Sequence, residues 1–314
     1  MCIGFGTNSV IKNQLWDKAL KFIYIFDKIK FLNICFLFTL TFKIHMWINL
    51  KIHINKKENK MKSIADVKNE LNNCTISELN SFIESYKEDS RAGVIKLVGS
   101  AYKKIDKHNK ELERLEIITQ YERKYQNMGI EYIGGIDEVG RGPYAGPVVT
   151  ACVILPKGCR IEGVNDSKKL SLKKREELFE VIKEKAVSVG VGIVDNNEID
   201  ELNILQATYK AMRIAVENMD IKPQQLLVDA VTIPDIDIPQ EAIIKGDAKS
   251  ISIGAASIIA KVTRDRMMVE YSKIYPQYGF ESNVGYGSKY HEEAIRKYGL
   301  CDIHRRSFTH KFYE

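Results

Sequence analysis

The chain has 314 residues, of which 45% are hydrophobic and 28% charged, and its formal net charge is +6 at pH 7. This is an ordinary globular composition, long enough for one large domain and a smaller part. Residues 1–60 alone carry +7, so the other 254 carry −1, which excludes overall basicity as an argument for nucleic-acid binding. The six cysteines lack metal-site spacing, so we expect reduced thiols in a cytoplasmic protein.

Residues 1–60 differ in composition from the rest, because Ile, Lys, Phe and Asn supply 33 of the 60. Their longest uncharged run, Phe31 to Phe42, has 12 residues, whereas a bilayer core needs about 20. Frequent lysines and the lack of a small-residue cleavage site argue against a secretory signal. We hypothesise a disordered upstream leader, with the working protein beginning at Met61. The alternative is an interfacial membrane anchor.

The next segment, residues 61–128, is predicted to be a polar, helical N-terminal extension. Thr75 and Glu78 fit a capping box that opens a helix. A one-sided helix is predicted from Tyr102 to about residue 127. Two glycines interrupt the pattern between these helices, Gly93 and Gly99.

Residues 129–314 change to a pattern of strands followed by alternating strands and helices. Strands are predicted over residues 132–137, 147–155, 187–194, 226–229 and 242–245. Helices are predicted over residues 172–186, 203–219 and 251–275, the last with a start rich in small residues that allows close packing on a sheet. The predicted fold class is α/β, with a mixed β-sheet flanked by helices on both faces.

Four acids stand at or just beyond the ends of apolar segments: Asp137, Glu138, Asp229 and Asp247. Oxygen ligands without nearby His or Cys suit Mg²⁺ or Mn²⁺. Two such ions support in-line displacement at phosphorus, so the four acids together predict a site for phosphodiester chemistry. Strand alternation sends Asp137 and Glu138 to opposite faces, so both reach one site only if the strand ends there. The alternative for each acid alone is a turn or cap residue.

Glycine-rich turns supply candidate substrate contacts. The turn Gly140-Arg141-Gly142 offers unobstructed backbone N–H groups to a sugar or phosphate, or it is a plain hairpin turn. Tyr286 stands between two glycines, where its ring can stack on a sugar or base, or pack within a turn.

Basic residues add further candidates. Lys168, followed by Lys169, lies in a polar loop and either contacts phosphate or is solvated. Near the C-terminus, His304-Arg305-Arg306 is compatible with a nucleic-acid backbone, and the alternative is a solvated basic tail.

These motifs, in this order, closely resemble those of the bacterial ribonucleases HII over residues 131–314. The matching stretches are Ile136-Asp137-Glu138-Val139-Gly140-Arg141-Gly142, Ala145-Gly146-Pro147-Val148, Asn165-Asp166-Ser167-Lys168-Lys169-Leu170, Val228-Asp229-Ala230, Lys245-Gly246-Asp247, Ala255 to Asp265, Gly285-Tyr286-Gly287 and His304 to Phe308. Residues 61–127 resemble the N-terminal extension of some members, whereas residues 1–60 match nothing known to us.

The resemblance implies a ribonuclease H-like fold and two Mg²⁺ or Mn²⁺ ions held by Asp137, Glu138, Asp229 and Asp247. It further implies that Gly140-Arg141-Gly142 reads the 2′-hydroxyl of a ribonucleotide and that Tyr286 stacks beside the RNA–DNA junction. The implied reaction cleaves the RNA strand of RNA–DNA hybrids, and cuts 5′ to single ribonucleotides in duplex DNA, leaving 3′-hydroxyl and 5′-phosphate ends. Ribonucleotide excision repair is the implied role.

Two alternatives stay open at this point. One is a ribonuclease HIII-like enzyme, against which Arg141 and Tyr286 argue, because that group usually has lysine where Arg141 stands. The other is a non-catalytic nucleic-acid-binding protein on the same fold. We expect a monomer with no membrane partner unless residues 1–60 are expressed, in which case a membrane-anchored scaffold is a third reading.

Overall fold

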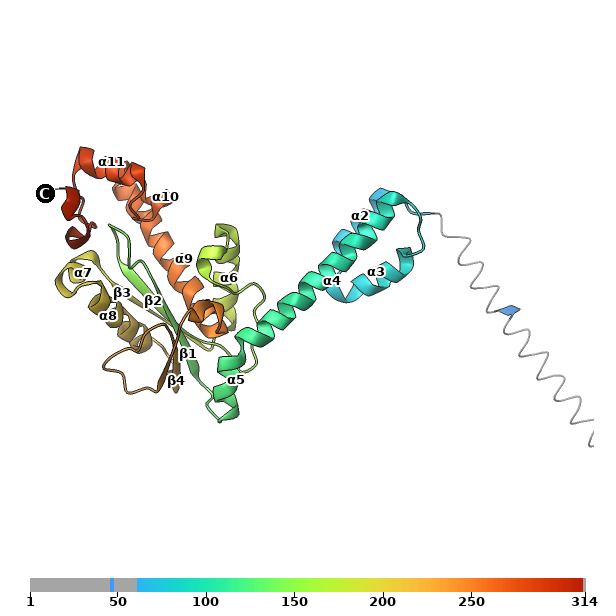
Figure 1. The fold of residues 1–314 in the computed structure, drawn as a ribbon, viewed down its shortest axis with the longest axis horizontal. Coiled ribbons are helices and arrows are strands. Elements are labelled where there is room, and N and C mark those ends of the chain that lie inside the picture. The colour runs from blue at the N-terminus through green and yellow to red at the C-terminus, as the bar shows by residue number, and fades with distance from the viewer. Residues whose placement is uncertain (1–45, 48–60, 313–314) are drawn as a thin grey trace, which may run out of the picture. The chain divides into compact units, whose positions relative to one another are not determined.

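The computed structural model describes residues 46–47 and 61–312 (Figure 1). The expectations for residues 1–60 therefore concern a segment that lies, apart from Met46 and Trp47, outside the described residues. In the described part of the chain, no helix is both long enough and apolar enough to cross a membrane. The chain falls into two compact units that divide between Tyr102 and Lys103.

The first unit is helical, as the sequence predicts. It contains α2 (Ile64–Asn73), η1 (Ile76–Glu78), α3 (Leu79–Tyr86) and the first part of α4 (Ala92–Ile118). The Glu78 carboxylate accepts hydrogen bonds from the Thr75 backbone N–H (2.8 Å) and hydroxyl (2.7 Å), which confirms the predicted helix start.

The predicted interruption at Gly93 and Gly99 is wrong, because α4 runs through both glycines. A helical glycine costs only about 1 kcal/mol relative to alanine, too little to break a 27-residue helix. Gly93 also has a packing role, since a Cβ there would lie 2.8 Å from the Ile64 side chain. This glycine lets α2 approach α4 closely.

A break at Thr119, which the sequence did not predict, separates α4 from α5 (Gln120–Asn127). The Thr119 hydroxyl donates to the Leu115 carbonyl at 2.8 Å, a side-chain bond that competes with the helical backbone pattern. Leu115 and Ile118 are buried in the core of the second unit. The end of α4 thus packs with the sheet, while the predicted boundary after residue 128 stays a prediction.

The second unit contains a five-stranded mixed sheet in the order β3-β2-β1-β4-β5, so β1 is central. Strands β2 and β3 continue antiparallel from β1, whereas β4 and β5 continue parallel. The bounds are β1 Ile133–Val139, β2 Val148–Ile154, β3 Ser188–Val194, β4 Gln225–Asp229 and β5 Gln240–Ile243. All five lie close to the predicted ranges, although β5 begins and ends two residues before the predicted one.

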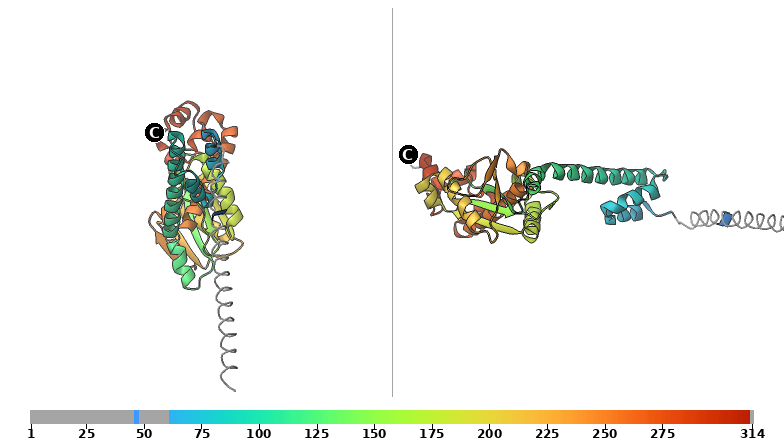
Figure 2. Two further views of the ribbon diagram at one scale, coloured as in Figure 1. Left: turned by 90° about the vertical axis from the view of Figure 1, so that its right-hand side faces the viewer. Right: turned by 90° about the horizontal axis from the view of Figure 1, so that it is seen from below.

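Helices cover both faces of this sheet, which confirms the predicted fold class. Figure 1 shows α9 (Ile251–Ile274, orange) and α6 (Leu172–Lys185) on one face and α8 (Ile204–Glu217) on the other, and Figure 2 gives two further views. Each face has its own apolar cluster. The small residues at the start of α9 serve the predicted close packing, because a Cβ on Gly135 of β1 would lie 2.1 Å from the Ser252 backbone.

Several short helices between and after the predicted elements were not predicted from the sequence. They are η2 (Ser167–Lys169), α7 (Asn196–Leu202), η3 (Gly246–Ala248), η4 (Pro276–Tyr278), α10 (Phe280–Asn283), α11 (Lys289–Tyr298), η5 (Arg306–Phe308) and η6 (His310–Phe312). Helices this short have little intrinsic stability, so tertiary packing decides them. Among the C-terminal ones, η4, α10, α11 and η6 pack around a third apolar cluster that includes Tyr278, Phe280 and Ile295.

Candidate active site

Two of the four predicted acids lie on adjacent parallel strands. Ile136 of β1 is opposite Val228 of β4, so the next residues, Asp137 and Asp229, are neighbours. Asp229 is the last residue of β4, and Asp137 lies near the carboxyl end of β1, which continues to Val139. Asp137 and Asp229 lie on the same face of the sheet as Gly135, and this face packs on α9. The carboxyl ends of parallel strands are where α/β sheets assemble sites.

A turn after β5 brings in the third acid, Asp247. The Gly246 N–H donates to Asp229 Oδ1 at 2.7 Å, which fixes the turn against β4. Burial raises the pKa of Asp247, and the charges of Asp166 and Asp229 raise it further. Asp166 is thus a further acid of this neighbourhood. The sequence pattern alone did not predict Asp166 as a residue of the site.

Asp137 is the most deeply buried of the four acids. Burial raises its pKa well above the ordinary value, and the adjacent Glu138 carboxylate adds to this effect. Asp137 Oδ1 accepts a hydrogen bond from the Glu138 N–H at 2.8 Å, and the Ser257 hydroxyl of α9, 2.9 Å from the Ser167 hydroxyl, opposes the rise in the pKa of Asp137. The sequence reasoning missed Ser257, because it treated the small residues of α9 as packing residues only.

Glu138 is less buried than Asp137. The expectation that the strand ends at these two acids is wrong, because β1 stays paired with β2 through Glu138 to Val139, so strand alternation separates the two side chains. Glu138 Oε1 accepts a long hydrogen bond from Arg141 Nη1 at 3.4 Å. Burial raises the pKa of Glu138, Arg141 opposes the rise, and the charge of Asp229 adds to it. Asp229 therefore acts electrostatically on Asp137, Glu138 and Asp247, so the four predicted acids form one electrostatic neighbourhood.

The chemistry of this neighbourhood fits divalent cations. All donors are carboxylate oxygens, which hard cations prefer, and their negative charges oppose one another in a partly buried place. Among residues 61–312, no three acidic, histidine or cysteine side chains already stand in an arrangement that would hold a metal ion. The carboxyl groups are neighbours but not a closed ligand set.

The turn after β1 is built on two buried arginines that the sequence reasoning did not recognise as its support. Arg305 donates to the carbonyls of Gly140 (2.6 Å), Arg141 (3.0 Å) and Gly146 (2.9 Å). Arg264 of α9 donates to the carbonyls of Pro147 (2.9 Å), Ala145 (3.0 Å) and Val284 (2.8 Å). Gly140 has φ +91°, and a Cβ there would lie 2.3 Å from Arg264 Nε, so this position requires glycine.

This arrangement orients the peptide groups of the turn. In a planar trans peptide the N–H points opposite to the carbonyl. Because the Gly140 and Arg141 carbonyls both face Arg305, the N–H groups of Arg141 and Gly142 point away from it. Two consecutive donors therefore point away from the buried arginine, with Arg141 and Gly142 themselves exposed.

Both interpretations of the basic tail are wrong for Arg305, which is neither solvated nor available to a phosphate backbone. It is fully buried, and burial together with Arg264 lowers its pKa to about 9, so it keeps its charge at neutral pH. Its preceding residue, His304, is buried as well. Five carbonyl groups around Ala145 and one from Val284 meet the two guanidinium groups, which is how their burial is compensated.

Tyr286 lies beside this turn although 144 positions separate it from Gly142. A Cβ on Gly142 would lie 3.9 Å from the Tyr286 ring, which is 40% exposed. The flanking glycines permit this docking, since a Cβ on Gly285 would lie 2.4 Å from the Ala145 carbonyl and one on Gly287 would lie 2.3 Å from the Tyr144 ring. The ring is therefore accessible, and it stands next to the outward N–H groups.

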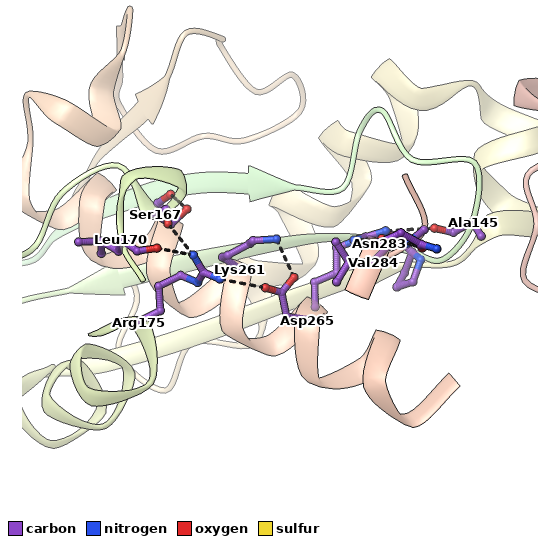
Figure 3. A network of polar contacts seen from close by, with 12 residues as sticks. Ala145, Ser167, Leu170, Arg175, Lys261, Asp265, Asn283 and Val284 are labelled. Carbon is purple, nitrogen blue, oxygen red and sulfur yellow. Dashed lines mark hydrogen bonds and ion pairs between the residues drawn. The ribbon is translucent and has the colours of Figure 1, made fainter. Parts of the chain in front are cut away.

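Lys168 is exposed in the polar loop between β2 and α6, and its charge acts on Asp247 by lowering the pKa of that carboxyl. The loop is anchored to α9. Figure 3 shows Arg175 donating to the carbonyls of Ser167 (3.2 Å) and Leu170 (2.7 Å) and pairing with Asp265, which also accepts from Lys261. Lys168 thus stands near the acids on a fixed loop.

Comparison with known proteins identifies the family. The family model for ribonuclease HII matches residues 134–311, and the model for the ribonuclease HII N-terminal domain matches residues 63–126. A ribonuclease HII of Clostridioides difficile (strain 630) is 55% identical over 247 residues, which cover 79% of this chain and 97% of that protein. A ribonuclease HII of Caldanaerobacter subterraneus subsp. tengcongensis is 58% identical over 202 residues, which cover 64% of this chain and 84% of that protein.

Among solved structures, the crystal structure of the ribonuclease H2 from Pyrococcus horikoshii OT3 aligns with a TM-score of 0.49 at 32% identity, covering 57% of this chain and 94% of that one. The sequence matches span most of the described residues, and the resemblance that the motifs indicated is thereby confirmed. The chain belongs to the ribonuclease HII family, and by that membership it is a ribonuclease.

Proposed function

We propose that this protein is a metal-dependent endoribonuclease. It cleaves the RNA strand of RNA–DNA hybrids and cuts 5′ to single ribonucleotides embedded in duplex DNA, leaving 3′-hydroxyl and 5′-phosphate ends. The observation that carries this proposal is that β1 leads directly from Asp137 and Glu138 into the turn beside which the Tyr286 ring lies. Groups suited to phosphodiester chemistry and groups suited to reading a sugar are therefore adjacent.

In this proposal Asp137, Glu138, Asp229 and Asp247 hold two divalent cations, Mg²⁺ or Mn²⁺. Such cations, when bound, supply an activated water and stabilise the charge on the leaving oxygen. The chain's own contribution is a partly buried, negatively charged neighbourhood in which the N–H groups of Glu138 and Gly246 orient the carboxyl groups of Asp137 and Asp229. These two contacts limit how far Asp137 and Asp229 can turn away.

Recognition of the ribonucleotide is assigned to the turn Gly140-Arg141-Gly142. Its outward N–H groups can donate to a 2′-hydroxyl oxygen, which DNA lacks. Tyr286 can stack beside the same sugar, because its ring stands at Gly142. Lys168 is assigned a phosphate contact, which its exposure and position near Asp247 support.

The test is cleavage of a DNA duplex containing one ribonucleotide, with and without Mg²⁺, by the full chain. We expect metal-dependent cleavage 5′ to the ribonucleotide and no cleavage of the matching all-DNA duplex. Sequencing-gel analysis of the ends checks for 3′-hydroxyl and 5′-phosphate groups. A retarded band without turnover would instead support a non-catalytic nucleic-acid-binding protein.

A further inference from the structure

Helix α5 carries a buried acid that the proposed chemistry does not use. Glu122 is only 6% exposed, and its Oε1 accepts hydrogen bonds from the Ser250 hydroxyl (2.5 Å) and the Ser252 N–H (3.0 Å). Ser250 is the N-cap of α9 and itself accepts from the Ile253 N–H at 3.2 Å. Glu122 therefore binds the first turn of α9, where a carboxylate is favoured by the helix dipole.

Helix α5 also contacts β5, the strand that precedes the Asp247 turn. Lys124 Nζ and the Tyr125 hydroxyl both contact Glu241 of β5, at 2.7 and 2.6 Å. The Tyr125 side chain also packs against the apolar cluster formed by β1, β4, β5 and α9. Because Glu241 precedes Asp247 in the chain and Ser250 follows it, the hydrogen bonds of α5 hold the chain on both sides of Asp247.

Hydrogen bonds of the backbone connect these contacts of α5 to Asp247 and Asp229. The Ser250 N–H donates to the Gly246 carbonyl at 2.8 Å, and the Gly246 N–H donates to Asp229 Oδ1 at 2.7 Å. A Cβ on Gly254 of α9 would lie 2.9 Å from the Asp247 carbonyl, so helix and turn are in tight contact. Movement of the first turn of α9 is therefore transmitted to Asp247 and Asp229.

Burial of Glu122 is a poor way to stabilise the fold by itself. Its Oε2 and the Ser252 hydroxyl are buried without a hydrogen-bond partner in the described part of the chain. Both residues line a cavity of about 70 Å³ that is also lined by Arg123. An apolar side chain would fill this space at a lower desolvation cost, so the value of the carboxylate lies in orienting the start of α9.

We propose that α5 is a positioning element for the metal site, and that Glu122 holds Asp247 and Asp229 where they can bind cations. The inference rests on the proposed function, because it takes these two acids as metal ligands. It gives the end of the N-terminal extension a role in the chemistry without contributing a group to the site. Glu122 acts through Ser250, Ser252 and the Gly246 turn.

The experiment measures Mn²⁺ binding to the metal-free full chain by isothermal titration calorimetry, without substrate. We expect Glu122→Ala to weaken binding about tenfold, as is typical when support behind a metal ligand is lost. Glu122→Gln should stay within about threefold of wild type, because its amide oxygen can accept the same two hydrogen bonds. The control, Ile182→Val, removes a methylene from the core beneath α6 and should leave Mn²⁺ binding unchanged.

Thermal unfolding of each metal-free variant separates positioning from general destabilisation. The inference is overturned if Glu122→Ala binds Mn²⁺ like wild type, or if Ile182→Val weakens binding equally. If Glu122→Ala does not fold, the double variant Lys124→Ala with Tyr125→Phe is used instead, because it removes both hydrogen bonds to Glu241. We expect this variant to bind Mn²⁺ severalfold more weakly than wild type. Wild-type affinity would contradict the inference. Asp247→Asn in the same titration tests the ligand assignment, since Mn²⁺ binding independent of Asp247 would refute the proposed function itself.

Discussion

The carboxyl group of Asp137 and the guanidinium group of Arg305 are both buried, yet the protein compensates their charges differently. Arg305 meets three backbone carbonyls, so its charge is satisfied within the fold. Asp137 meets other acids, and burial with the adjacent Glu138 raises its pKa. The charge of Arg305 is thus compensated within the fold, whereas the charges of the acids would be compensated only by the divalent cations of the proposed function.

The largest effect that tests this contrast is expected from Asp137→Asn. Loss of one ligand charge should cost several kcal/mol of transition-state stabilisation, which at 1.36 kcal/mol per tenfold is at least about a thousandfold in cleavage rate. Single-turnover cleavage of a duplex with one ribonucleotide measures it. Near-wild-type turnover would refute the site assignment.

The same variant should be more stable than wild type when divalent ions are absent. Because the folded-state pKa of Asp137 is raised, its contribution to stability is present below the unfolded-state pKa and lost as pH rises through the folded-state value. At neutral pH the wild-type carboxylate therefore opposes folding, and asparagine removes that effect. Urea unfolding in a chelator checks this, and a less stable variant would contradict the contrast.

Arg305→Ala removes the buried charge that the fold compensates by hydrogen bonds. It leaves the carbonyls of Gly140, Arg141 and Gly146 without their donor, and we expect a loss of about 3 to 5 kcal/mol in the free energy of unfolding. Arg305→Lys keeps the charge but not the fork of donors, so it should recover only part of that loss. Urea unfolding at pH 7 measures both, and full recovery by lysine would show that charge alone matters.

Protonation of His304 offers a pH test close to the same turn. Burial and then His291 lower the pKa of His304 from 6.5 to about 4. Its contribution to stability is therefore complete above pH 6.5 and lost as pH falls towards 4, about 3 kcal/mol in all. NMR titration of labelled histidine rings should find this ring neutral at pH 5, and a charged ring there would contradict the expectation.

The smallest effect is expected from Tyr286→Ala, which removes stacking but little packing. Base stacking contributes about 1 to 3 kcal/mol, so cleavage at an isolated ribonucleotide should fall about ten- to hundredfold while Mn²⁺ binding stays unchanged. Tyr298→Ala, at another exposed tyrosine (53% exposed), is the control and should retain wild-type cleavage. Equal loss of cleavage and metal binding would mean that the Tyr286 ring is structural.

Local sequence patterns predicted the strands and the long helices of the second unit, because alternation and helical periodicity depend on neighbouring residues only. They also placed Asp229 at a strand end, which is correct, and Asp137 at another, although β1 continues to Val139; the sheet register brings these two acids together. They failed at Gly93, where the helix continues because a helical glycine costs too little to break it, and at Thr119, where the helix breaks at a hydroxyl that donates to the Leu115 carbonyl.

The sequence by itself determined the alternating strands, the acids at their ends and the glycines beside Arg141 and Tyr286. Tertiary structure alone decided that Arg305 is buried beneath the turn, that Tyr286 stands at Gly142, and that Glu122 caps α9. The reason is physical. These contacts join residues more than a hundred positions apart, and whether a charged side chain meets water or a buried carbonyl depends on what the fold packs around it.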